Sequence, residues 1–221
     1  MKKPVQIDDK ILLFDFDGTI VETEVLAREV IETYFRERNS TEGSRFANLI
    51  VGKTWKLAVE EMQREATQIG LHLGASDVLI REFKARYQER FHRGVNLIPG
   101  FEKWLPEFRK RARFMGIVTG SDRSEVEAIL GAHQINGVFD RIWGFGDYAE
   151  SKPHPSPYLT ALAEIGADPA DVLVFEDSSA GMESAYRAGL GWIQVSHENH
   201  ARIPDPRSLK VIRDWTEFTT P

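Results

Sequence analysis

The chain has no cysteine, so disulfide bonds and thiolate metal sites are excluded, and a reducing compartment, the cytoplasm, is expected. It also has no long hydrophobic run. The first apolar stretch, Ile11–Phe14, is followed at once by Asp15, so no signal peptide or membrane span is predicted. Basic residues are not in excess, because 28 lysines and arginines are outnumbered by 34 aspartates and glutamates. We therefore expect no nucleic-acid or membrane partner.

The residues that are present are typical of an ordinary globular protein. The 221 residues are 42% hydrophobic and 28% charged, which is enough to bury a core. This length suits a single α/β domain that carries an insertion. We expect a monomer or a weak dimer that acts on a small molecule.

Short apolar runs that end in polar or glycine-containing turns predict the strands of a sheet. The runs are Ile11–Phe16, Phe114–Val118, Arg141–Phe145, Val172–Phe175, Trp192–Val195 and Lys210–Ile212. Helices are expected between them, at about Gly100–Arg111, Ser124–Ala132, Pro157–Ile165 and Ala180–Arg187. The alternation favours an α/β fold with a doubly wound parallel sheet, in which ligands bind beyond the carboxyl ends of the strands.

This alternation is interrupted between the first two strands. Apolar residues recur at helical spacing from residue 25 to residue 91, and no strand pattern separates them. We predict an inserted all-helical cap domain of four helices, residues 22–96, which returns to the sheet near Ile98-Pro99-Gly100. The α/β core domain would then comprise residues 1–21 and 97–221.

The sequence Asp15-Phe16-Asp17-Gly18-Thr19 is the most distinctive feature of the chain. Two carboxylates stand where a buried strand ends, and Gly18 allows the backbone to turn sharply and to approach a ligand. Asp-Gly is also a common turn dipeptide, and Asp15 could simply cap the strand. An aspartate in an apolar strand is costly unless it is paired or bound to a metal, which favours a functional role.

Two more polar clusters follow the second and third predicted strands. Thr119-Gly120-Ser121 offers a hydroxyl and main-chain amides ahead of a helix, a combination that can hold an anion. Taken alone, the cluster is better explained as a helix N-cap formed by Ser121 or Asp122. Lys152 lies in a loop, where a solvated charge is the ordinary interpretation, but the following Pro153 stiffens its position.

Glu176 and Asp177 close the fourth predicted strand. Beside Asp15 they would form a dense negative cluster that requires a cation. Hard oxygen ligands without any cysteine favour Mg²⁺ over zinc or copper. The competing interpretation is a helix N-cap, in which Asp177 or Ser178 caps the helix at about Ala180–Arg187.

Together these clusters supply a nucleophile, a hydroxyl, a cation and a metal site at the ends of different predicted strands. The sequence resembles the haloacid dehalogenase superfamily of phosphotransferases, in the branch that carries a helical cap after the first motif. The resemblance spans about Lys10 to Trp192. Its motifs are DFDGT at 15–19, TGS at 119–121, SKPHP at 151–155 and FEDS at 175–178.

The resemblance implies a reaction and a metal site. Asp15 would attack phosphorus and form an aspartyl-phosphate, while Asp17 would act as general acid and then as general base. Mg²⁺ would be held by Asp15, by the main-chain carbonyl of Asp17, and by Glu176 and Asp177.

The resemblance also implies phosphate ligands and a function. Thr119, the Gly120 amide and Lys152 would hold the phosphoryl oxygens. The expected activity is Mg²⁺-dependent hydrolysis of a small phosphorylated metabolite, such as a sugar phosphate. Substrate specificity would come from the cap, where Gly52 and Lys53 lie at a predicted turn between helices.

Three other functions remain as alternatives. A phosphomutase of the β-phosphoglucomutase type would share the core motifs, but the cap histidine of that branch falls at Ala27 here, which favours hydrolysis. A haloacid dehalogenase needs neither Asp17 nor the pair Glu176 and Asp177. A non-catalytic binding module has no physical reason to retain like charges at one site.

Overall fold

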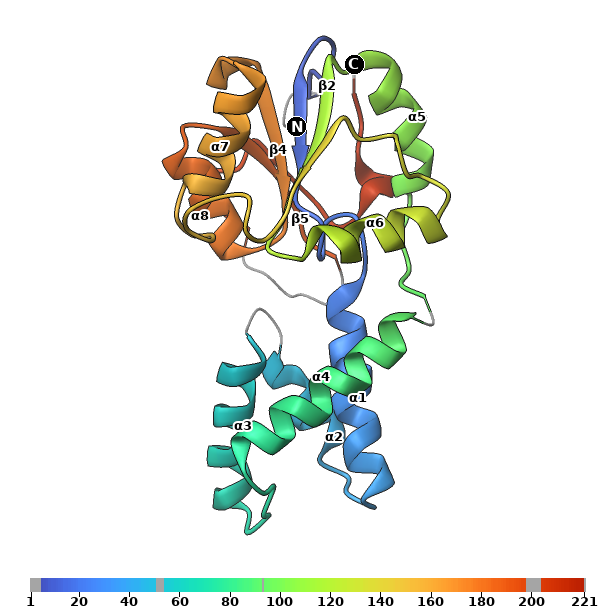
Figure 1. The fold of residues 1–221 in the computed structure, drawn as a ribbon, viewed down its shortest axis with the longest axis vertical. Coiled ribbons are helices and arrows are strands. Elements are labelled where there is room, and N and C mark those ends of the chain that lie inside the picture. Colours follow the sequence, from blue (N-terminus) through green and yellow to red (C-terminus); the bar gives the residue numbers. More distant parts are fainter. Residues whose placement is uncertain (1–4, 51–53, 93, 198–203, 221) are drawn as a thin grey trace. The chain divides into compact units, whose positions relative to one another are not determined.

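The computed structural model describes residues 5–50, 54–92, 94–197 and 204–220, and it divides the chain into two compact units (Figure 1). The α/β unit comprises Met1–Glu22 and Asn96–Pro221, and the helical unit comprises Thr23–Val95. The chain thus leaves the α/β unit after its first strand and returns to it before the second. None of the helices in the four described ranges is long and apolar enough to cross a membrane.

The α/β unit is built on a parallel sheet (Figure 1). Its described strands are β1 (Ile11–Phe14), β2 (Phe114–Val118), β3 (Arg141–Trp143), β4 (Val172–Glu176), β5 (Gly191–Val195) and β6 (Lys210–Ile212). Their order is β3-β2-β1-β4-β5-β6, and every neighbouring pair is parallel. The predicted α/β fold is confirmed. Phe14 pairs with Ile117 and with Phe175, so β1, β2 and β4 end side by side.

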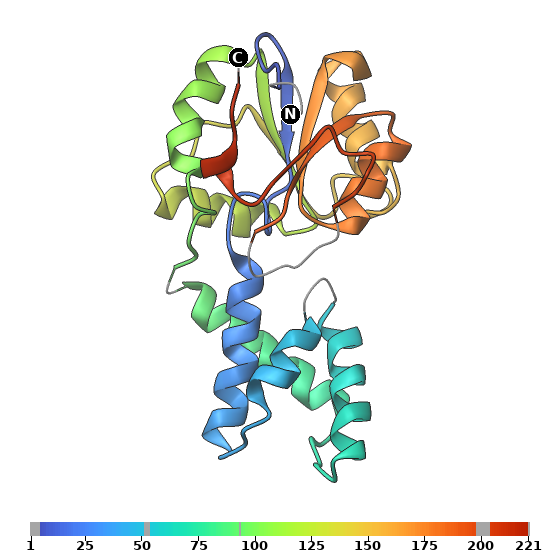
Figure 2. The ribbon, with the colours of Figure 1, turned by 180° about the vertical axis from the view of Figure 1, so that it is seen from behind.

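Helices cover both faces of this sheet. They are α5 (Phe101–Arg111), α6 (Arg123–Ala132), α7 (Ser156–Ile165) and α8 (Ser179–Arg187), with the short 3-10 helices η2 (Pro169–Asp171) and η3 (Trp215–Glu217). Figure 2 shows α5 on one side of the strands and α7 and α8 on the other. Successive residues of β1 point to opposite faces, so Phe14 contacts Phe108 of α5, whereas Leu13 packs with Tyr158 and Met182.

Two strands are shorter than the sequence predicts, and the first of them, β1, ends at Phe14 rather than at Phe16. β3 ends at Trp143 rather than at Phe145, because the chain turns away from the sheet there. The amide of Gly144 donates a hydrogen bond to the Asp147 carboxylate, and the amide of Phe145 donates one to the carbonyl of Ser121, both at 2.9 Å. These bonds attach the loop after β3 to the segment that follows β2.

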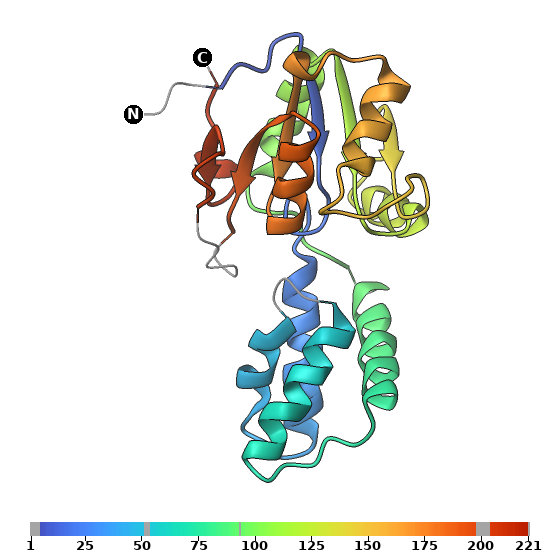
Figure 3. The same cartoon turned by 90° about the vertical axis from the view of Figure 1, so that its left-hand side faces the viewer.

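The helical unit has a hydrophobic core of its own, which includes Ile31, Phe46 and Phe83. Its helices are drawn in blue to green in Figure 3. Its described elements are α1 (Thr23–Glu37), α2 (Gly43–Ala47), η1 (Asn48–Ile50), α3 (Trp55–Gln68) and α4 (Ser76–His92), with no strand among the described residues. Thr54 begins α3 as its N-cap, since its hydroxyl accepts a hydrogen bond from the Leu57 amide.

Candidate active site

Asp15 lies immediately after β1, at the middle of the sheet's carboxyl edge. Its amide donates a hydrogen bond of 2.9 Å to the carbonyl of Phe175, so the backbone continues the ladder with β4 for one more residue. Asp15 is only 7% exposed. Because β2 and β4 end on either side of β1, the residues that follow them, including Thr119, are brought to the same edge.

Lys152 is a buried partner of Asp15. Its ammonium nitrogen Nζ donates to Asp15 Oδ1 at 2.6 Å, to Glu176 Oε1 at 2.5 Å and to the carbonyl of Val118 at 2.8 Å. The side chain is 10% exposed, so it is not a solvated loop lysine. Burial alone would lower its pKa, but Asp15 and Glu176 outweigh burial and hold the pKa of Lys152 well above its ordinary value.

Three buried carboxylates gather at this edge. Asp15, Glu176 and Asp177 each offer one oxygen, and these oxygens lie within 4.8 Å of one another. Glu176 is 0% exposed and Asp177 is 2% exposed. Burial, followed by the negative charge of Glu176, raises the pKa of the Asp15 carboxyl well above its ordinary value, although Lys152 acts in the opposite direction. Burial and the neighbouring carboxylates therefore disfavour a negative charge on Asp15.

Gly18 allows the loop after β1 to pack against Asp177. Its φ is +81°, in the left-handed region that favours glycine. A Cβ at this position would lie 2.2 Å from Asp177 Oδ2. The sharp turn that the sequence predicts at Gly18 is present, and the backbone there approaches a carboxylate of the neighbouring strand end.

Asp17 is held by two hydroxyls from the segment after β2. Ser121 Oγ donates to Asp17 Oδ2 at 2.5 Å, and Thr119 Oγ1 donates to the same oxygen at 3.3 Å. Asp122 occupies the N-cap position of α6 but makes no side-chain capping bond. The capping interpretation is therefore not supported here. A side chain at Gly120 would meet no atom within 4 Å, so its backbone faces open space.

Ser178, rather than Asp177, caps α8. Its hydroxyl accepts a hydrogen bond of 2.9 Å from the Gly181 amide. The carboxylate of Glu176 lies over the start of this helix, where a Cβ on Gly181 would come within 1.9 Å of Glu176 Oε1. The side chain that caps α8 is therefore a hydroxyl, and not the carboxylate of Glu176 or of Asp177.

Comparison with known families agrees with this geometry. The model of the haloacid dehalogenase-like hydrolase family matches residues 12–195, which include all the site residues above. The chain belongs to this family.

Relatives of this hydrolase are similar over most of their length. Protein CbbY of Rhodobacter capsulatus is 33% identical over 194 residues, covering 82% of each chain. Validoxylamine A 7'-phosphate phosphatase of Streptomyces hygroscopicus subsp. limoneus is 25% identical, covering 96% of this chain and 97% of its own. The crystal structure of CbbY from Rhodobacter sphaeroides in complex with phosphate has a TM-score of 0.69 at 23% identity, covering 94% of this chain and 95% of that one.

The structure of the hydrolase adds residues that sequence reasoning missed. Ser121 belongs to a recognised motif, but its bond to Asp17 was not predicted. Tyr158 Oη donates to Glu176 Oε1 at 2.8 Å, and Tyr148 Oη donates to the carbonyl of Thr119 at 2.7 Å. No sequence signal distinguishes either tyrosine from a packing residue. The predicted specificity residues, 52 and 53 (Gly52 and Lys53), lie outside the described residues.

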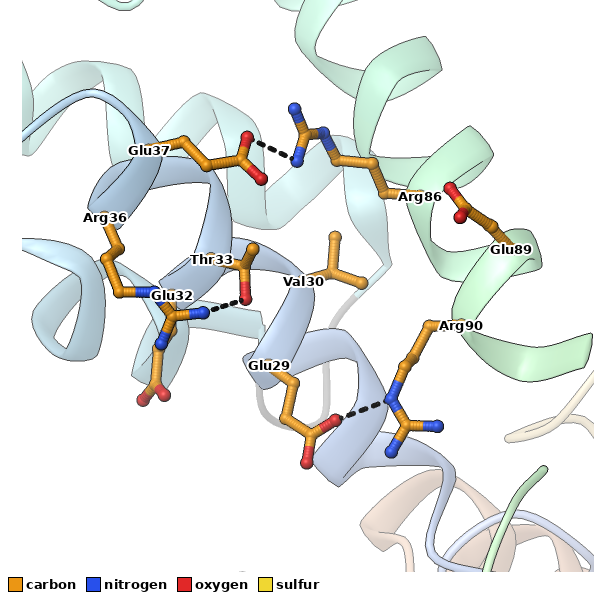
Figure 4. A pocket seen from close by; sticks show the side chains of 9 residues that line it. All are labelled: Glu29, Val30, Glu32, Thr33, Arg36, Glu37, Arg86, Glu89 and Arg90. Atoms are coloured by element: carbon orange, nitrogen blue, oxygen red, sulfur yellow. Dashed lines mark hydrogen bonds and ion pairs between the residues drawn. The ribbon is translucent and has the colours of Figure 1, made fainter. Parts of the chain in front are cut away.

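A pocket of about 570 Å³ lies in the helical unit, between α1 and α4 (Figure 4). Most of the side chains that line it are charged, and two ion pairs cross it: Arg86 with Glu37 at 2.8 Å and Arg90 with Glu29 at 2.9 Å. These pairs are partly exposed and join the two helices. The pocket contains none of the predicted site residues, and its paired charges are consistent with a solvated groove.

Proposed function

We propose that this hydrolase is a Mg²⁺-dependent phosphatase of small phosphorylated metabolites, with Asp15 as its nucleophile. The observation that supports this most strongly is the placement of the Asp15 carboxylate. It touches the Lys152 ammonium at 2.6 Å and shares a buried cluster with Glu176 and Asp177. A nucleophilic carboxylate beside a cation and a metal site is what attack on a phosphate ester requires.

The donor set fits Mg²⁺. Asp15, Glu176 and Asp177 provide hard oxygen ligands, and cysteine is absent from the chain. Lys152 contacts both Asp15 and Glu176, so one positive charge faces these two negative charges. We propose that these three side chains and the main-chain carbonyl of Asp17 hold the ion. When bound, it offsets the repulsion between an anionic carboxylate and an anionic phosphate.

The protein side chains divide the remaining work. We propose that Asp15 attacks phosphorus while Lys152, Thr119 and the Gly120 amide hold the phosphoryl oxygens. Asp17 protonates the leaving oxygen and later removes a proton from the attacking water. Its hydrogen bonds from Ser121 and Thr119 orient the carboxylate for both steps.

A residue near the start of α1 favours hydrolysis over phosphate transfer within the substrate. Ala27, which stands where the β-phosphoglucomutase branch carries its cap histidine, is 7% exposed and has no group that can titrate. The name of the validoxylamine A 7'-phosphate phosphatase supports a phosphate monoester as the substrate class. Release of inorganic phosphate from p-nitrophenyl phosphate and from a panel of sugar phosphates, with and without Mg²⁺, tests the proposal.

Glu176→Gln and Asp177→Asn are each expected to raise the Mg²⁺ concentration needed for half-maximal activity by about tenfold or more. Each substitution replaces an anionic ligand with a neutral amide of the same shape. The measurement is the initial rate of p-nitrophenyl phosphate hydrolysis across a Mg²⁺ titration. Glu102→Gln, on the exposed surface of α5, is the matched control and should leave the titration unchanged. Full wild-type activity in excess chelator would contradict the metal site.

A further inference from the structure

Tyr158 connects the apolar core beneath the site to two of its charged residues. It lies on α7, is 0% exposed, and packs in a cluster with Leu13, Trp143 and Met182. Its hydroxyl donates to Glu176 Oε1 at 2.8 Å. Phenylalanine would fill the same apolar space without a polar atom to satisfy, so the hydroxyl is accounted for by the carboxylate and not by packing.

The oxygen that Tyr158 contacts is the one that holds Lys152. Lys152 Nζ donates to Glu176 Oε1 at 2.5 Å, and the same nitrogen lies 5.1 Å from the centroid of the Tyr158 ring. Tyrosine therefore contacts the ammonium with its ring and the partner carboxylate with its hydroxyl. The other oxygen, Glu176 Oε2, accepts from Ser178 Oγ at 3.2 Å and from the amides of Asp177 and Ser178 at 3.2 and 3.3 Å.

Glu176 is thus fixed at both oxygens. The main chain at the start of α8 holds Oε2, and the side chain of α7 holds Oε1, so rotation of the carboxylate breaks at least one bond. A fixed Oε1 gives Lys152 a fixed acceptor. The remaining donors of Lys152 then point to the Val118 carbonyl and to Asp15 Oδ1.

We propose that Tyr158 is a positioning residue whose hydroxyl fixes Glu176 and, through it, directs the Lys152 ammonium at Asp15. This inference rests on the proposed phosphatase function for its kinetic consequence, but the coupling of Tyr158 to Lys152 is a property of the protein itself. It acts before substrate binds, because every bond in the chain of contacts is made by the protein alone.

Tyr158→Phe tests the hydroxyl while keeping the ring. We expect kcat for p-nitrophenyl phosphate at saturating Mg²⁺ to fall about tenfold, as for the partial loss of one hydrogen bond to a charged group, with KM changed less than kcat. The control is Tyr186→Phe on α8, because Tyr186 is 54% exposed and its ring contacts Arg207 outside the site. The control should keep both kinetic constants.

A second measurement probes the environment of the Lys152 ammonium in the absence of substrate. Nitrogen-15 NMR of the lysine ammonium groups, in the presence of chelator, follows the Lys152 signal, which Lys152→Met identifies by its disappearance. In the wild type, and in Tyr186→Phe, this signal should show slow hydrogen exchange, because the ammonium is buried and fully bonded. In Tyr158→Phe we expect the signal to shift and its exchange with water to accelerate.

The outcomes separate the two proposals. An unchanged Lys152 signal together with wild-type kcat in a folded Tyr158→Phe variant would overturn the positioning role, even if urea denaturation showed lower stability. Wild-type protein without phosphatase activity would overturn the proposed function, whereas the Lys152 signal would still decide the coupling on its own.

Discussion

Asp15→Asn is expected to reduce turnover to below about 1% of the wild-type rate while the folded protein becomes more stable. The amide has the same shape as the carboxylate but cannot attack phosphorus. Without Mg²⁺, the carboxylate is surrounded by the charges of Glu176, Asp177 and Asp17, opposed by Lys152, and its pKa is raised by burial first and by these neighbours second. Removing its charge therefore relieves an unfavourable burial.

The gain in stability is expected to depend on pH in a defined direction. Because the folded-state pKa of Asp15 lies above the ordinary value of 3.8, protonated Asp15 stabilises the wild type at low pH. This contribution is lost as the pH rises through the folded-state pKa. The variant has no such group, so its advantage in free energy of unfolding should be absent below about pH 4 and should grow toward neutral pH.

Urea denaturation in excess chelator, at a series of pH values, measures this difference. Asp77→Asn is a suitable control, because its side chain is 73% exposed on α4 and far along the chain from the site motifs. The control should retain full activity. An Asp15→Asn variant that hydrolyses substrate at more than about 1% of the wild-type rate would remove Asp15 from the role of nucleophile.

Lys152→Met is expected to have the largest combined effect on activity and stability. Activity should fall by about a thousandfold or more, because the substitution removes a charge that contacts the nucleophile and that we propose holds the phosphate. The free energy of unfolding should fall by about 3–5 kcal/mol at neutral pH, since Asp15 and Glu176 lose the cation that they share.

This loss of stability should diminish in acid. Without the ammonium, which lowers the pKa of Asp15, the buried carboxyl of Asp15 has a folded-state pKa still further above that of the unfolded chain, so folding takes up protons. The stability of Lys152→Met should then recover as the pH falls toward about 4, and the difference from the wild type should be greatest at neutral pH. Lys103→Met on the exposed side of α5 is the control. An equal urea midpoint for Lys152→Met and the wild type at neutral pH would contradict the buried ion pair.

The arrangement of the strand ends could be predicted from the sequence because it depends on topology. In a parallel sheet the residues that follow neighbouring strands meet at one edge, so Asp15, Thr119 and Glu176 were expected near one another. Chain order alone does not fix which strands are neighbours, and the structure places β1 between β2 and β4. Recognition of the strands was therefore enough to predict that the motifs lie at one edge of the sheet, but not which motifs are adjacent.

The contacts made by loop and helix side chains could not be predicted in the same way. Lys152 lies in a loop whose path depends on the packing around it. The number of residues between Asp15 and Lys152 in the sequence therefore does not predict the distance between their side chains. Tyr158 fits the apolar face of α7, and its hydroxyl gains a role only from the rotamer of Glu176. The bond between Ser121 and Asp17 likewise depends on two side-chain conformations.

Local contacts decide where β3 ends and which residue caps α8. The apolar run at Arg141–Phe145 favours a longer strand than β3. The amides of Gly144 and Phe145, which would have continued the strand, instead donate hydrogen bonds to the Asp147 carboxylate and the Ser121 carbonyl. At the start of α8, both Asp177 and Ser178 are good capping residues. Packing against Gly18 places the Asp177 carboxylate beside the loop after β1, and Ser178 caps the helix.

Chemical trapping of the phosphorylated side chain shows directly whether Asp15 is the nucleophile. The Asp17→Asn variant is mixed with p-nitrophenyl phosphate and Mg²⁺, quenched with borohydride, which reduces an acyl phosphate to homoserine, and analysed by peptide mass spectrometry. The nitrophenolate leaves without a general acid, whereas water is not activated without Asp17, so the phosphoenzyme should accumulate. We expect homoserine at position 15 alone. Homoserine at another acidic position, or an unmodified Asp15 in a preparation that releases a burst of nitrophenolate, would contradict it.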